Sequence, residues 1–245
     1  MKQTFLFIFI FFVSIQHNFS QKLVLSDQSE ISIITAGPGD VLYEAFGHSA
    51  IRVKDATLNL DIIFNYGLFD FNQPNFYVNF VKGRLLYRLG KQSFRRFITS
   101  YDYQQRWVKN QVLNLSLVDR VKIFEYLNEN SLPENAEYLY DPYFNNCATK
   151  LRDIAKEILG NKIQFPSSFS DKNFTLRQLM NQELPWNTWD SFGINLALGN
   201  TLDNEIIADN YMYLPDYVHK AFQNATITKN KITTPLVLEE SQLLR

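Results

Sequence analysis

The stretch Asn145-Asn146-Cys147-Ala148-Thr149-Lys150-Leu151-Arg152-Asp153-Ile154-Ala155-Lys156-Glu157-Ile158-Leu159-Gly160 predicts the clearest helix of the chain, from Cys147 to Leu159. Its apolar residues recur at positions i, i+3, i+4 and i+7 and form one face. An asparagine before the cysteine can cap the helix, and Gly160 can end it. Cys147 therefore belongs to the first turn, where free backbone amides and the helix dipole favour a thiolate and can hold an oxyanion.

The candidate base is His48, in the sequence Phe46-Gly47-His48-Ser49-Ala50-Ile51-Arg52-Val53, which predicts a turn followed by a strand. Residues 61–66 are predicted to pair with this strand, which brings Asn65 or Tyr66 near the imidazole to orient it. A slip of one residue exchanges the two faces, so both candidates stay open. The other histidine beyond residue 20, His219, is expected on a surface helix. A cysteine at a helix start and a histidine on a strand are typical of thiol hydrolases and acyltransferases.

Further elements are predicted from periodicity, caps and turns. Strands are expected near 31–35, 85–89 and 107–115, and an extended segment at 137–144. Helices are expected at 41–46, 75–81, 94–103, 117–130, 175–182 and 215–222, and the part from residue 161 onward is expected to be loop-rich. The fold class is α+β, with an antiparallel sheet packed against the helix that carries the cysteine, and with extra helices.

The first 20 residues are predicted to be a signal peptide, because Lys2 precedes a short apolar run and Ser20 precedes a candidate cleavage point. Residues 21–245 are then a single exported domain. With 24 basic and 25 acidic residues, the chain lacks the basic excess of a nucleic-acid-binding protein. Its one cysteine excludes an intrachain disulfide, and no histidine or cysteine spacing indicates a metal. No cofactor is expected.

Several motifs resemble the Lnb N-terminal periplasmic domain family. They are Gly37-Pro38-Gly39-Asp40, the segment around His48, Asn65-Tyr66-Gly67-Leu68-Phe69-Asp70-Phe71, Pro74-Asn75-Phe76-Tyr77, Asn146-Cys147-Ala148-Thr149, Arg152-Asp153 and Leu214-Pro215. The series extends from about residue 29 to 220. Asn145 departs from the aspartate that is common at its position in the family. The family's acyltransferase is also expected to continue into membrane helices, whereas no later stretch here approaches eighteen consecutive apolar residues.

The resemblance implies a circularly permuted papain-like fold of the NlpC type, in which histidine precedes cysteine. It also implies lipoprotein N-acylation, with Cys147 as the acyl-carrying nucleophile and His48 as the base. The candidate orienting or oxyanion groups beside them are Asn65, Tyr66 and Asn146. The partners would be a lipid acyl donor and a lipoprotein amine, with contact to a membrane surface. The location would be the periplasm or outer cell envelope.

Two alternatives remain open at this stage. The same cysteine and histidine suit a peptidoglycan peptide hydrolase, whose thioester would pass to water or another acceptor. The chain can also be a non-catalytic exported binding module that keeps only the fold. The distance between the Cys147 sulfur and the His48 ring separates the module from both enzymes, because a working pair lies within about 4–5 Å.

Overall fold

The computed structural model describes residues 23–170, 173–185 and 187–245, so the predicted signal peptide lies outside the described residues. A seven-stranded sheet has the order β10-β5-β1-β2-β3-β4-β6. Every neighbouring pair in it is antiparallel. A second sheet has the order β7-β8-β9. The α+β class with an antiparallel sheet is confirmed.

The helices and strands alternate along the chain without a simple repeat. Their bounds are β1 Ser29–Ala36, η1 Leu42–Glu44, β2 His48–Asp55, β3 Leu60–Leu68, α1 Phe76–Val81, β4 Leu86–Ser93, α2 Phe94–Tyr103, β5 Val108–Leu113, α3 Leu117–Asn130, β6 Glu137–Leu139, α4 Cys147–Leu159, η2 Gly160–Lys162, β7 Ile163–Gln164, η3 Ser167–Phe169, α5 Leu176–Glu183, α6 Trp189–Ala197, η4 Asn200–Asp203, α7 Ala208–Tyr211, α8 Pro215–Asn224, β8 Thr226–Lys229, β9 Ile232–Pro235 and β10 Val237–Leu244.

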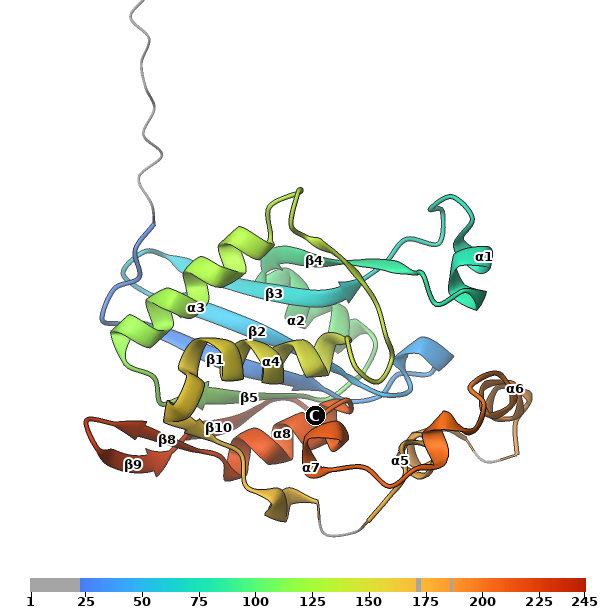
Figure 1. The fold of residues 1–245 in the computed structure, drawn as a ribbon. Helices are drawn as coiled ribbons and strands as arrows, with labels where there is room; N and C mark the ends of the chain where they lie inside the picture. The colour runs from blue at the N-terminus through green and yellow to red at the C-terminus, as the bar shows by residue number, and fades with distance from the viewer. Residues whose placement is uncertain (1–22, 171–172, 186) are drawn as a thin grey trace, which may run out of the picture.

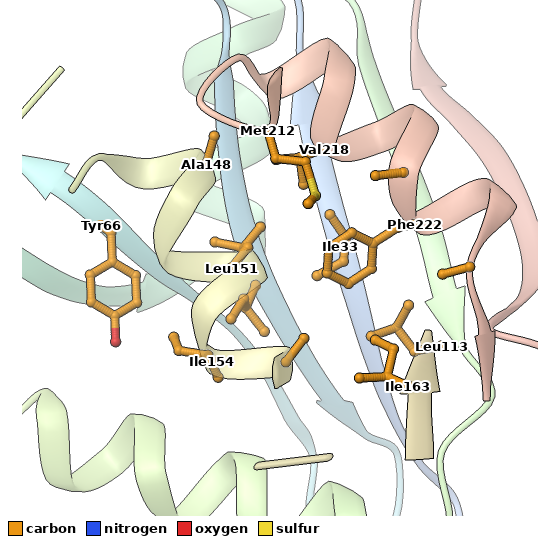
Figure 2. Close-up of a cluster of buried hydrophobic side chains, with 14 of the residues drawn as sticks. Ile33, Tyr66, Leu113, Ala148, Leu151, Ile154, Ile163, Met212, Val218 and Phe222 are labelled. Carbon is orange, nitrogen blue, oxygen red and sulfur yellow. The ribbon is translucent and has the colours of Figure 1, made fainter. Parts of the chain in front are cut away.

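The helices form layers on both faces of the large sheet (Figure 1). Helices α3, α4 and α8 cover one face, and α2 covers the other. The apolar stripe of α4, with Leu151 and Ile154, is buried between the sheet and α8, where it meets Ile33 and Phe222 (Figure 2). A smaller cluster under α2 includes Phe97. Burial of α4 on both sides holds the first turn of this helix against the strands.

Most predicted elements are found, and α2, α3 and α4 have the predicted bounds. The helix expected at 41–46 is wrong, because only the 3-10 turn η1 forms there. The Gly39 N–H bonds to the Glu44 carbonyl, and so does the Gly47 N–H. These bonds fold the segment into a closed loop and leave no length for α-helical turns.

The expectation of a loop-rich part after residue 161 needs correction. Helices α5 to α8 and strands β7 to β10 lie there, and β10 pairs with β5 at the edge of the large sheet. Strand β10 is mostly exposed and shows no clean alternation of apolar and polar residues. Its main-chain pairing, rather than its side-chain pattern, defines the strand. No described helix is long and apolar enough to cross a membrane.

Candidate active site

Cys147 begins α4, and Asn146 is its N-cap. The Asn146 side-chain oxygen accepts hydrogen bonds from the Ala148 and Thr149 N–H groups, both at 2.9 Å. The Thr149 hydroxyl accepts in return from the Asn146 N–H at 2.8 Å, which completes a capping box. This cap fixes the first turn, so the thiol has a defined position at the positive end of the helix dipole.

His48 begins β2, the strand that packs most closely against α4. Its Nε2 lies 2.5 Å from Asn65 Oδ1 on β3. An amide oxygen only accepts hydrogen bonds, so Nε2 carries the hydrogen and Nδ1 is the nitrogen left for the thiol. Asn65 is buried, which leaves its side chain little freedom to release the imidazole.

Gly67 marks the point where the cysteine and the histidine meet. A Cβ built on this glycine would lie 3.7 Å from the Cys147 Cβ and 3.9 Å from the His48 Cε1. The glycine has φ of +95°, a conformation that a side chain disfavours. Cys147 and His48 are both half-buried rather than enclosed. Residues from β2, β3 and α4 therefore converge on one accessible spot.

The pKa values of the two groups move in opposite directions. Burial raises the pKa of the Cys147 thiol, but the charge and hydrogen bond of His48 and the N–H groups of Ser49 and Ala148 outweigh it, and the net shift is downward. Burial lowers the pKa of His48, but the Cys147 charge and the hydrogen bonds with Cys147 and Asn65 raise it overall. Both shifts favour a thiolate beside an imidazolium.

The remaining sequence candidates lie elsewhere or have other partners. The Tyr66 hydroxyl accepts a bond from Asn130 on α3, and its ring points to the α4 side of the sheet (Figure 2). Asn146 donates its side-chain N–H groups to the Pro142 and Tyr213 carbonyls. Its amide is thus used within the cap, and only Asn65 of the three candidates contacts His48. His219, expected on a surface helix, lies on α8 but is mostly buried, and its Nε2 lies 3.3 Å from a Glu240 carboxylate oxygen.

A family comparison identifies the domain that holds this arrangement. The model of the Lnb N-terminal periplasmic domain matches residues 16–189. The chain belongs to this family. Comparisons with curated proteins and with solved structures found no match.

The part matched to the Lnb N-terminal periplasmic domain contains all three converging residues, His48, Asn65 and Cys147. It ends where α6 begins, so α7, α8 and strands β8 to β10 lie beyond it. Membership places the chain in the periplasm, as expected from its N-terminal sequence. The match names no catalytic residue, and the roles of the three side chains remain proposals.

Sequence reasoning missed three residues of the site. Gly67 has no side chain at the place where a Cβ would contact both Cys147 and His48. Arg106 is buried, donates from Nε to the Gly37 carbonyl at 2.8 Å, and lowers the pKa of His48 through its charge. Burial raises the pKa of Tyr140, and the charge of Cys147 raises it further. The Tyr66-Gly67 pair was the only local signal, since a glycine inside a strand marks a bulge or a close approach.

Proposed function

We propose that this chain is an exported thiol acyltransferase or hydrolase that acts through an acyl-thioester on Cys147, in a reaction like lipoprotein N-acylation. The observation that carries the proposal is the convergence of Cys147, His48 and Asn65 around Gly67. We further propose that α4 with β2 and β3 is the core of a circularly permuted papain-like fold. A non-catalytic module has no need for a cysteine and a histidine whose pKa values shift toward an ion pair.

In the proposed mechanism, the Cys147 thiolate attacks the carbonyl carbon of an ester, and the carbonyl π electrons move to its oxygen. When the tetrahedral intermediate collapses, the bond to the leaving alkoxide breaks, and the His48 imidazolium gives it a proton. An amine then attacks the thioester, and His48 takes one proton from that amine as the Cys147 thiolate leaves. Water in place of the amine gives hydrolysis, with the same proton transfers.

The oxyanion needs a donor that the helix does not already use. The Ala148 and Thr149 N–H groups bond to Asn146 Oδ1, and the Lys150 N–H bonds to the Asn146 carbonyl. The Cys147 N–H is the first-turn amide left over among the described residues. We assign it to the developing oxyanion, a contribution that is typically about 3 kcal/mol for one such donor.

An acyl chain fits the surroundings of the thiol better than a muropeptide does. Tyr140, whose pKa the Cys147 charge raises, stacks on Tyr87 with ring centroids 4.0 Å apart, and Tyr87 lies 5.0 Å from Phe69. These rings continue to Phe71, 4.8 Å from Phe69 and largely exposed. This series of aromatic rings offers apolar contact to an acyl chain, whereas a peptide with several charges needs polar partners.

A thiol titration tests the proposal. The rate of Cys147 alkylation is measured against pH for the wild type, His48→Ala and Asn65→Ala, with His219→Ala as the matched histidine control. We expect the wild-type thiol to react at lower pH than a free cysteine, His48→Ala to move the profile upward, and His219→Ala to leave it in place. If the alkylation profile of Cys147 stays the same in His48→Ala, that result would contradict the proposed enzyme and favour a non-catalytic binding module.

A second measurement identifies the acyl donor. The protein is incubated separately with a diacyl phospholipid and with muropeptides, and Cys147 is examined by mass spectrometry, with Cys147→Ser as the control. We expect an added fatty acyl mass on Cys147 only with the phospholipid. A peptide adduct would identify a peptidoglycan hydrolase instead, and no adduct with either substrate would count against both versions.

A further inference from the structure

Three segments lie at the end of the molecule where α4 begins (Figure 1). Each of them exposes large apolar side chains. They are the turn at 41–43, the hairpin at 69–88 that holds α1, and helix α6. We call them the three prongs. Their most exposed members, between 50% and 87% accessible, are Tyr43, Phe71, Val78, Trp189, Phe192 and Leu196. Exposed apolar residues gathered on one side indicate a surface that binds something apolar.

The exposed apolar residues of helix α6 form one continuous face of the helix. Trp189, Phe192 and Leu196 follow at spacings of three and four, so they share one side of the helix. Trp189 and Phe192 contact each other edge to face, with centroids 6.1 Å apart. Their exposed fractions are 87% and 59%, so this face lies against solvent rather than against the core.

The hairpin prong at 69–88 is more basic than the chain as a whole. The hairpin at 69–88 contains three basic residues and one acidic residue, Asp70, in a protein whose formal net charge is −1. The three basic residues, Lys82, Arg84 and Arg88, are all exposed. Among the described residues, none of these three forms an ion pair. Exposed cations around exposed aromatic residues are the composition that binds anionic lipid surfaces.

The prongs also connect to the thiol. Tyr43 contacts Phe69 at 5.9 Å and Phe71 at 6.3 Å, measured between ring centroids. Phe69 contacts Tyr87, and Tyr87 stacks on Tyr140. A series of ring contacts therefore joins the prongs to Tyr140, whose pKa responds to the charge of Cys147.

We propose that the three prongs dock this domain on an anionic phospholipid bilayer, with the aromatic side chains at the level of the headgroups and Lys82, Arg84 and Arg88 against lipid phosphates. Charge complementarity selects a bilayer, because a purely apolar surface would suit a second copy of the chain equally well. The inference rests on the proposed function only in giving the site a lipid supply, since docking itself needs no thiol.

Vesicle sedimentation with the mature chain tests the docking. Wild-type protein is mixed with vesicles of phosphatidylcholine alone and with vesicles that contain phosphatidylglycerol, at low and high salt. We expect binding to the anionic vesicles that weakens as salt rises. Two variants remove one contribution each: Phe71→Ser with Val78→Ser removes the apolar contact, and the triple change to glutamine at Lys82, Arg84 and Arg88 removes the charge.

Matched controls come from the β8–β9 hairpin at the opposite end of the molecule (Figure 1). Ile232→Ser changes an apolar residue that is 65% exposed, and Lys231→Gln removes an exposed cation. We expect both prong variants to lose at least about tenfold in vesicle partitioning, because one removes apolar contact with the bilayer and the other removes attraction to anionic headgroups. The two controls should bind like the wild type.

Three outcomes would overturn the proposal. One is no binding to anionic vesicles, and another is unchanged binding by both prong variants. The third is self-association without vesicles that the Phe71 and Val78 changes abolish, which would assign the prongs to a second copy. Cys147→Ala should still bind vesicles. A protein that fails to bind vesicles but shows the expected thiol titration therefore refutes only this inference. A protein that binds vesicles but has an unperturbed thiol refutes only the proposed function.

Discussion

Asn65 and Tyr66 are neighbours on β3, yet only one of them contacts the candidate base. Side chains alternate across a strand, so Asn65 lies beside His48 while Tyr66 enters the core and bonds to Asn130. A short polar amide also suits this position better than a phenol. It accepts from Nε2 without charge, which leaves the opposite nitrogen of the ring to exchange a proton with the thiol.

Gly67 gives the first residue-scale prediction. Gly67→Ala places a methyl group against Cys147 and His48 at a φ of +95°. We expect a loss of about 1 kcal/mol in the free energy of unfolding and a several-fold slower alkylation of Cys147. Gly83→Ala is the control, because its φ is +62° and a Cβ there meets nothing within 4 Å. Both variants should lose stability in a denaturant titration. Equal alkylation rates in the two would refute the steric role of Gly67.

Arg106 gives the second prediction at the residue scale. Its positive charge lowers the pKa of His48, so Arg106→Gln should raise that pKa and extend the thiolate–imidazolium pair to higher pH. Arg106→Lys keeps the charge and should stay closer to the wild type. The measurement is the pH titration of the His48 ring by proton NMR, assigned against His48→Ala. A His48 pKa that falls in Arg106→Gln would show that Arg106 acts through the loop at Gly37 rather than through its charge.

At the scale of elements, the cap of α4 links stability to chemistry. Asn146→Ala removes the acceptor of two backbone N–H groups and the donors to Pro142 and Tyr213. We expect a loss of about 2 kcal/mol in the free energy of unfolding and a higher Cys147 pKa, because the first turn loosens. Thr175→Ala removes the matching capping box of α5. It should cost about 1 kcal/mol and leave the alkylation profile of Cys147 unchanged.

The helices that were predicted well have residues at both ends, or at the start, that signal where a helix begins or stops. Helix α4 has Asn146 before it and Gly160 after it, and α3 begins after Ser116, whose side chain accepts from the Asp119 N–H. Strands β8 and β9 have no comparable start or stop residues. Asn230 and Lys231 nevertheless both have positive φ in the turn between them. Thr-Ile alternation around Asn230 was the available signal for this hairpin. The choice between Asn65 and Tyr66 depended on register, which no local pattern fixes.

At the scale of the whole molecule, the meeting of Cys147 and His48 follows from packing between segments far apart in sequence. Helix α4 reaches β2 only because β1 to β3 form a continuous hairpin series and α8 covers the other side of the helix. Sequence predicted the element of each residue and a sheet packed against the helix of Cys147, but not the contact between α4 and β2 or the cover by α8. The family resemblance supplied the pairing before the structure did, and the prongs emerged only from the exposed fractions in the folded chain.

The last prediction concerns acid stability, which two buried carboxylates should dominate. Burial raises the pKa of Asp55, but hydrogen bonds from Ser26 and from the Thr57 and Leu58 N–H groups lower it overall. Asp119 behaves alike, with burial opposed by Lys162 and Ser116, and its ion pair with Lys162 spans 2.5 Å. Both folded-state pKa values lie below those of the unfolded chain.

The stabilisation is therefore complete above the unfolded value of about 4 and is lost as pH falls through the folded values. We expect the free energy of unfolding to decline steeply below about pH 4. Asp55→Asn should lower it by roughly 2 kcal/mol at neutral pH and flatten the decline, since an amide keeps one acceptor but no charge. The measurement is urea denaturation at a series of pH values, with the exposed Asp27→Asn as control. An equally steep decline in Asp55→Asn and Asp119→Asn would refute the assignment, because neither carboxylate could then be a source of the acid sensitivity.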